Sequence, residues 1–154
     1  MNIEEFKLSK NLTLKEMKVS KDHPDVAANI LFNEFDIVSL QLWATTCFQP
    51  IRDKFGPTQV LSGKRSNQLN KAIGGSQDSD HLYCLAGDIH CVKIKDQIDV
   101  FHWIIEESNI YYRQVIYYPE QGFIHISCNR FGRPYKKEAL IKTTNGYIKY
   151  KGDK

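Results

Sequence analysis

The segment from Asp36 to Gly56 places the strongest constraint on the fold, because its apolar residues recur at three- and four-residue steps. That spacing puts them on one face of an α-helix, which must be buried against another layer of structure. The residues of this stripe are Leu40, Trp43, Ala44, Cys47, Phe48, Ile51 and Phe55. Pro50 interrupts the pattern and predicts a kink, while Gly56 and Pro57 end the helix.

The rest of the chain alternates strand patterns with shorter helices. The predicted strands are residues 58–63, 85–94, 111–118 and 122–129. Shorter helices are predicted at 66–75 and 98–108, and a terminal hairpin at 139–150 turns around Asn145 and Gly146. This order indicates an α+β fold, with helices flanking a small, mostly antiparallel sheet. We expect a single domain over residues 1–154, with its core at about 10–130.

Composition narrows the class of protein. A length of 154 residues with 42% apolar and 25% charged residues fits one soluble globular domain. A net charge of +3 is compatible with an anionic partner such as a cell-wall polymer, and is too small to indicate nucleic acid. The N-terminus lacks the apolar segment of a signal peptide, and no stretch approaches the ~18 apolar residues of a membrane span. The four cysteines have no metal-binding spacing, so we expect reduced thiols, with Cys47 in the core.

Three polar side chains are candidates for a metal site. His81 ends a loop, Asp88 lies on the predicted strand that follows it, and His125 lies on a later strand. If the two strands are neighbours, the three side chains converge. Two nitrogens and one carboxylate oxygen suit zinc, which in catalytic sites has three protein ligands and one open position. Spacing alone is weak evidence, because a lone histidine on a strand is more often a packed or surface histidine, so the residues by themselves leave both interpretations open.

A run of short motifs surrounds these three residues. They are Pro-Ile-Arg at 50–52, Ser-Gly-Lys-Arg-Ser at 62–66, Leu-Asn at 69–70, Gly-Gly-Ser at 74–76, Ser-Asp-His at 79–81, Ala-Gly-Asp at 86–88 and His-Ile-Ser at 125–127. In this order they strongly resemble the M15 zinc peptidases, which include D-Ala-D-Ala carboxypeptidases and phage L-Ala-D-Glu endolysins. The resemblance covers about residues 10–130. It implies a Hedgehog/DD-peptidase-like fold and zinc as the cofactor.

The resemblance also implies individual roles. His81, Asp88 and His125 match the zinc ligands of the family. Arg65 matches an arginine that orients the substrate and stabilises developing negative charge, although a surface arginine after a strand is the alternative. Ser79 is expected to bind the substrate or its own loop.

The implied mechanism exposes two departures from the family. Bound zinc lowers the pKa of a water molecule to about 7, and an acidic side chain then takes the water's proton and returns it to the leaving amine. The family places that acid three residues before the last histidine, where this chain has Gly122. Glu120, in the preceding turn, is our candidate, and a solvent-facing position is equally consistent; Asp78 and Asp80 are weaker candidates. Cys84 stands where the family has glycine.

Other polar and aromatic residues near the motifs are interpreted as scaffold. His90 shares a strand face with Asp88 and is expected to be a half-buried strand histidine, with a contact to a metal ligand as the alternative. The aromatic residues of the later strands are expected in the sheet core rather than at a ligand, with a place for one of them at the border of a substrate groove as the alternative. These residues are Tyr111, Tyr112, Tyr117, Tyr118 and Phe123.

The resemblance therefore implies a zinc-dependent peptidase that hydrolyses the stem peptide of peptidoglycan next to a D-amino acid. We expect a monomer with no nucleic-acid partner and no membrane span. Without a signal peptide or a wall-binding module, a phage or prophage endolysin is favoured, reaching the cell wall or periplasm with the help of a holin; an exported protein without its leader would look the same. The alternative is a non-catalytic, zinc-stabilised structural or wall-binding module, such as a virion component.

Overall fold

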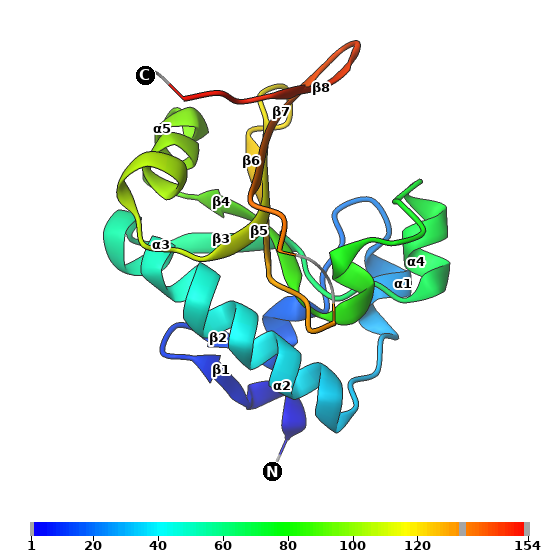
Figure 1. Cartoon of the computed structure of the whole chain (residues 1–154). Coiled ribbons are helices and arrows are strands. Elements are labelled where there is room, and N and C mark those ends of the chain that lie inside the picture. Colours follow the sequence, from blue (N-terminus) through cyan, green and yellow to red (C-terminus); the bar gives the residue numbers. More distant parts are fainter. Residues whose placement is uncertain (1, 133–134, 153–154) are drawn as a thin grey trace.

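A computed structural model describes residues 2–132 and 135–152, and its main feature is a six-stranded sheet in the order β3-β4-β6-β5-β7-β8 (Figure 1). The strands are β3 (Thr58–Ser62), β4 (Ala86–Cys91), β5 (Tyr112–Tyr118), β6 (Phe123–Cys128), β7 (Glu138–Thr143) and β8 (Gly146–Lys149). Strands β5 and β7 are parallel, and the other neighbours in this sheet are antiparallel. Strands β1 (Lys7–Ser9) and β2 (Leu12–Thr13) form a separate small sheet. The predicted α+β class is confirmed, while the Hedgehog/DD-peptidase-like fold stays a prediction.

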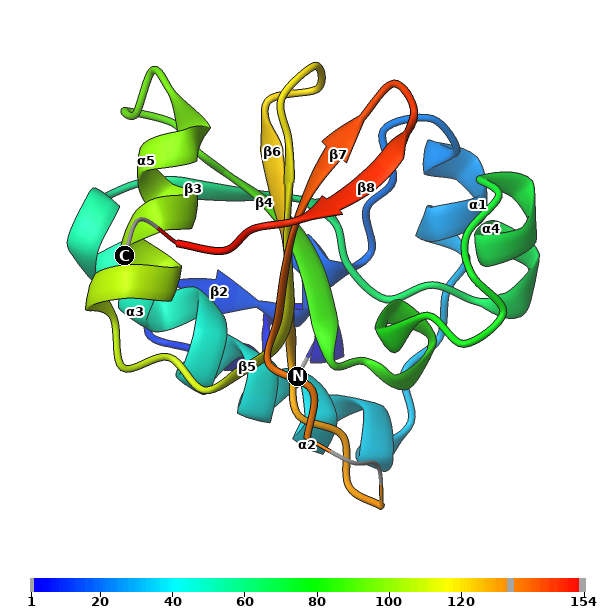
Figure 2. The same ribbon diagram turned by 45° about the horizontal axis from the view of Figure 1, so that its top comes forward.

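Helices lie on both sides of the large sheet. They are α1 (Pro24–Ala28), α2 (Glu34–Trp43), α3 (Gln49–Phe55), α4 (Asn67–Ala72) and α5 (Gln97–His102). Short 3-10 segments occur at Ile3–Glu5, Leu14–Met17 and Asp80–Tyr83, and π-helical segments at Ala44–Phe48 and Trp103–Glu107. Helices α2, α3 and α5 gather on one side of the sheet, whereas α1 and α4 pack together on the other (Figures 1 and 2). In the described part of the chain, no helix has the length and apolar character needed to cross a membrane.

A turn of π-helix interrupts the predicted helix near Pro50, while a kink there stays a prediction. The segment Ala44–Phe48 widens the helix between α2 and α3 and ends two residues before the proline. Proline has no N–H, and its ring would clash with the carbonyl of Thr46 in a regular α-helix, so the wider turn relieves that conflict. The apolar stripe survives the change. Its fully buried members are Leu40, Trp43, Ala44, Cys47, Phe48 and Ile51.

The two faces of the sheet differ sharply in chemistry. On the back face, which α2, α3 and α5 cover, Trp43 lies so close to Gly87 that a Cβ there would be 2.4 Å from the indole ring. The Trp43 indole N–H also donates to the carbonyl of Ile126 at 3.0 Å. Strand alternation turns the next residue, Asp88, to the opposite or front face, where it pairs across the strands with His125. Thus the sheet separates an apolar core from the candidate site.

The C-terminal strands form a hairpin, as the sequence indicates. Strands β7 and β8 pair antiparallel, with Thr143 opposite Gly146 at the turn. Gly146 has φ 120°, a conformation that residues with a Cβ rarely adopt. Because β7 pairs with β5, the hairpin extends the sheet beyond the strands that carry Asp88 and His125.

Candidate metal centre

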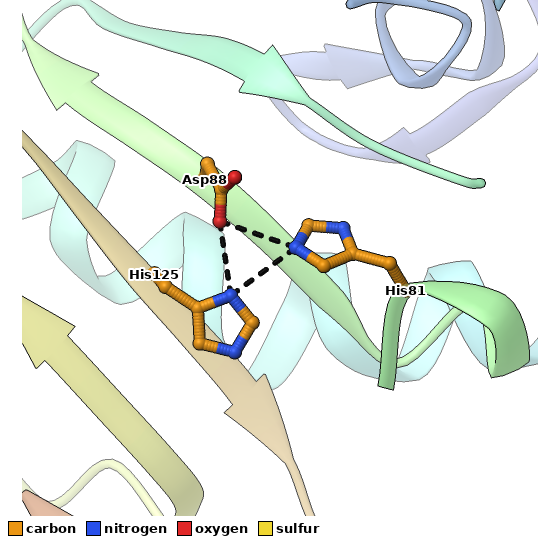
Figure 3. Close-up of side chains that lie close together, drawn as sticks. All are labelled: His81, Asp88 and His125. Atoms are coloured by element: carbon orange, nitrogen blue, oxygen red, sulfur yellow. Dashed lines mark hydrogen bonds and ion pairs between the residues drawn. The ribbon is translucent and has the colours of Figure 1, made fainter. Parts of the chain in front are cut away.

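His81, Asp88 and His125 converge on the front face of the sheet (Figure 3). The His81 Nε2 atom is 3.1 Å from Asp88 Oδ1 and 3.1 Å from His125 Nδ1. The third side of the triangle, from His125 Nδ1 to Asp88 Oδ1, is 2.9 Å. Zinc bonds of 2.0–2.1 Å in a tetrahedral site place ligand atoms about 3.3 Å apart. The three atoms therefore lie close to the arrangement that one zinc ion requires.

The protonation of His81 supports the same interpretation. Its Nδ1 is 2.7 Å from the carbonyl oxygen of Gly63, which can only accept, so Nδ1 carries the proton. Burial lowers the pKa of His81 and favours the neutral ring, although Asp88 opposes this effect. The lone pair of Nε2 then faces the carboxylate oxygen of Asp88. Two electron-rich atoms at this distance are unfavourable without a cation between them, so the donor set fits a metal ion.

Asp88 uses its two carboxylate oxygens for different partners. Oδ1 faces the histidines, and Oδ2 accepts from Arg65 Nη2 at 3.3 Å. Burial by itself would raise the pKa of Asp88, but His81 and His125 hold that pKa well below its usual range. The side chain is therefore a carboxylate, as a metal ligand must be.

Arg65 is held beside the ligands by three side chains. Besides its bond to Asp88, its Nε donates to Ser62 Oγ at 3.3 Å and its Nη1 to Asn70 Oδ1 at 3.4 Å. Burial lowers the pKa of Arg65, but Asp88 favours the charged form. The predicted arginine thus reaches the site, where it orients the carboxylate of the candidate metal ligand Asp88. It also lines the adjoining cleft.

Two glycines of the motifs allow close backbone contacts. A Cβ at Gly63 would lie 2.3 Å from the carbonyl oxygen of Met17, so this loop can approach the N-terminal segment only with glycine. A Cβ at Gly75 would lie 2.1 Å from Asn70 Oδ1. Asn70 in turn donates to the carbonyl of Ser76 at 2.8 Å. The Leu-Asn and Gly-Gly-Ser motifs therefore act together to hold the loop beside Arg65.

Cys84, the residue in place of the family glycine, occupies a left-handed conformation with φ 59°. Its thiol donates to Asp36 Oδ1 at 3.4 Å, and Asp36 also forms an ion pair with Lys64. Burial raises the pKa of Cys84, as does the charge of Asp36, so the thiol stays protonated. All four cysteines are buried with free thiols, and for Cys47 the predicted place in the core is confirmed. Asp36 was not identified from the sequence, where the available signal was its capping box with Asn33.

Ser79 and the two neighbouring aspartates have partners within the protein. The Ser79 Oγ accepts from the backbone N–H of His81 at 3.3 Å, so it stabilises the loop that presents this ligand. Asp80 is buried and lies 3.4 Å from Arg113 Nε, while Asp78 accepts from Arg130 at 2.9 Å. Binding of substrate by Ser79 stays a prediction. Neither arginine was identified from the sequence.

Glu120 lies in the turn between β5 and β6 and is exposed. It is not among the described residues that line the cleft over the ligands. This position agrees with the solvent-facing alternative, and whether Glu120 acts as the acid is left to a variant. The following Gly122 has φ 68°, and its carbonyl accepts from His90 Nδ1 at 2.7 Å. His90 is half-buried and links β4 to this turn, as expected for a scaffold residue.

A cleft of about 810 Å³ lies over the candidate ligands. Tyr118 and Phe123 line it from the front face of β5 and β6, so their interpretation as core residues is wrong. Tyr111 is 59% exposed, which also contradicts that interpretation, whereas Tyr112 is buried and Tyr117 packs against the core. For Tyr118 and Phe123 the cause is that alternation separates the two faces of a strand without saying which face meets the helices, whereas Tyr111 lies just before β5.

A protein-family model described as Peptidase M15 matches residues 10–127, a range that includes His81, Asp88, His125 and Arg65. Among the curated proteins, none matches the sequence. The family match covers well over half of the 154 residues. The chain belongs to the peptidase M15 family.

Proposed function

We propose that the protein is a zinc-dependent peptidase that hydrolyses the stem peptide of bacterial peptidoglycan next to a D-amino acid. The observation that carries the proposal is the convergence of His81, Asp88 and His125 below a cleft, in a member of a peptidase family. Two imidazoles and one carboxylate are a donor set that zinc prefers, and three protein ligands leave a position open.

The chain's own residues prepare the site in distinct ways. Zinc, when bound, supplies a nucleophile near neutral pH by lowering the pKa of a water molecule to about 7, and it polarises the scissile carbonyl. Gly63 fixes the ring of His81, and Arg65 fixes the carboxylate of Asp88. The contacts described for Arg65 use three of its five N–H donors, which leaves two for a carbonyl or carboxylate of the substrate.

The substrate and the place of action follow from the resemblance to cell-wall peptidases. We propose that the protein acts at the bacterial cell wall or periplasm as a phage or prophage endolysin, or as a carboxypeptidase of the same peptide. A cleft of about 810 Å³ supports a ligand larger than a single amino acid.

The proposal is tested by incubating the zinc-loaded protein with purified muropeptides and analysing the products by mass spectrometry. We expect release of D-alanine or cleavage between L-Ala and D-Glu, abolished by a chelator and restored by added zinc. A parallel incubation with peptides made only of L-amino acids should show no cleavage. Unchanged muropeptides in the presence of folded, zinc-loaded protein would contradict the proposal.

A second candidate is a non-catalytic, zinc-stabilised module that binds the cell wall. It is favoured by one observation: Gly122 occupies the position expected for the acid, and Glu120 is exposed in the turn beside it. Such a module would gain thermal stability from zinc and bind muropeptides without changing them. The same mass-spectrometric experiment therefore separates the two candidates.

A further inference from the structure

The C-terminal hairpin contributes to the cleft although it lies beyond residues 10–127, the range matched to the family. Leu140 of β7 and Tyr147 of β8 line the same cleft as His81, Asp88 and His125. In Figure 2 the hairpin stands on the side of the sheet toward α1 and α4. The wall of the cleft is thus completed by a segment outside the family match.

Three aromatic rings form this part of the cleft, which we call the aromatic wall: Tyr118, Phe123 and Tyr147. The rings of Tyr118 and Phe123 are stacked, with centroids 4.4 Å apart. Tyr147 meets Tyr118 edge-on, and their hydroxyl oxygens are 3.4 Å apart. The Lys142 ammonium lies 4.5 Å from the centre of the Tyr147 ring. The hairpin is therefore fixed against β5 by side chains as well as by the strand pairing.

The chemistry of the aromatic wall suits a peptide rather than an ion. Its rings, with Ile116 and Leu140, offer apolar surface, and its two phenols offer hydrogen bonds to peptide groups. Burial raises the pKa of Tyr118, so its hydroxyl remains a donor at neutral pH. Tyr147 is 53% exposed and free to contact a ligand.

Phe123 lies on β6 with His125, whereas Tyr147 forms the far end of the wall from the candidate ligands. In the order β4-β6-β5-β7-β8, β8 is three strands from β6, or about 14 Å at the usual spacing of about 4.8 Å. An extended peptide rises about 3.3 Å per residue, so this distance corresponds to about four residues. A ligand that reached both the metal site and Tyr147 would therefore be an oligopeptide.

We infer that the β7–β8 hairpin forms a binding subsite for the part of an oligopeptide substrate that lies several residues from the scissile bond, with Tyr147 as a specificity-determining residue. This inference rests on the proposed function, because it assumes that the substrate's scissile bond sits at the metal centre. It predicts that the hairpin matters for long substrates and not for short ones.

The test compares Tyr147→Ala with Ile148→Ala, a control on the same strand that is also 53% exposed but is not among the residues lining the cleft. The substrates are a disaccharide stem pentapeptide and a dipeptide with the same scissile bond, blocked only at an end that is also linked in the pentapeptide. We expect Tyr147→Ala to raise KM for the pentapeptide about ten-fold, with kcat retained and the dipeptide unaffected. Tyr147→Phe, which keeps the ring, should restore most of the affinity, and Ile148→Ala should change neither substrate.

Equal effects of Tyr147→Ala on both substrates, or no effect on either, would overturn the inference while leaving the peptidase intact. If the wild-type protein cleaves nothing, the proposed function fails, and calorimetry of the same pentapeptide with zinc-loaded protein tests the subsite instead. About ten-fold weaker binding by Tyr147→Ala than by Ile148→Ala would support the subsite, and equal binding would overturn it. Thermal unfolding of each variant verifies that the hairpin variants remain folded.

Discussion

Two neighbouring residues of strand β4, Gly87 on the back face and Asp88 on the front face, are constrained by different kinds of contact. On the back face, steric contact requires glycine at position 87, because the Trp43 ring occupies the space where a Cβ would be. On the front face, polar contacts favour a carboxylate at position 88, because Asp88 is surrounded by His81, His125 and Arg65. The difference teaches that the back face should respond to mutation mainly through stability, and the front face mainly through metal binding and activity.

The largest effect is expected on the front face. His81→Ala removes one of three ligand atoms, so we expect loss of bound zinc and a fall in the rate of hydrolysis of at least about 10²-fold. Replacing a residue that only hydrogen-bonds to a metal ligand typically lowers metal affinity or activity by about 10–100-fold, and loss of the ligand itself should lower them more. Zinc content by atomic absorption and muropeptide hydrolysis measure the result. His102→Ala, a half-buried histidine on α5, is the matched control and should keep both properties. Full zinc occupancy in His81→Ala would refute the ligand assignment.

On the back face, Gly87→Ala should act through stability. The added Cβ would lie 2.4 Å from the Trp43 ring, and the indole is held by its bond to Ile126. We expect the free energy of unfolding to fall by about 2–3 kcal/mol, as for an overpacked core. Urea denaturation measures the loss, and zinc content per folded molecule should stay the same. If stability were unchanged while zinc binding was lost, the division between the two faces would be wrong.

Asp36 connects the helix layer to the loop that carries Arg65, and its effect should depend on pH. Burial raises its pKa, but hydrogen bonds from Lys64 and the backbone of Asn33 lower it below the usual 3.8 overall. The pKa of Asp36 is thus lower in the folded than in the unfolded protein. Its contribution to the free energy of unfolding is therefore fully present above pH 3.8 and is lost as the pH falls through the pKa of the folded state. We expect Asp36→Asn to cost about 1 kcal/mol at pH 7 and progressively less below pH 3.8.

Urea denaturation of Asp36→Asn and wild type between pH 3 and pH 7 measures this difference. Asp25→Asn, an exposed residue in the first turn of α1, serves as the control and should show little effect at any of these values. A difference that stays constant or grows toward pH 3 would argue against the ion pair with Lys64.

The smallest effect is expected for Glu120→Gln. Because Glu120 is exposed and does not line the cleft, we expect the rate of hydrolysis to change by less than about two-fold, as for an ordinary surface substitution. Glu107→Gln, exposed at the end of the π-helical segment, is the control. A fall of about 10²-fold or more, typical of a lost general acid or base, would show that Glu120 reaches the reacting water.

Local patterns predicted much of the fold. The apolar stripe with Pro50, the helix capped by Ser66 and the turn at Gly146 each depend on residues close in sequence, and each is present. The aromatic residues were harder, because Tyr117 and Tyr118 are adjacent and a strand sends them to opposite faces. Only the position of the helices decides which face is the core.

The sequence by itself determined the α+β class and, through its linked motifs, the membership in a metallopeptidase family and the three candidate ligands. These depend on spacing and on chemical type, which the chain carries locally. Tertiary structure alone decided how Gly63 orients His81, how Asn70 holds Arg65, and that Tyr147 joins the cleft from the far edge of the sheet. The physical reason is that hydrogen bonds and clefts are made by atoms that meet only after strands distant in sequence have paired.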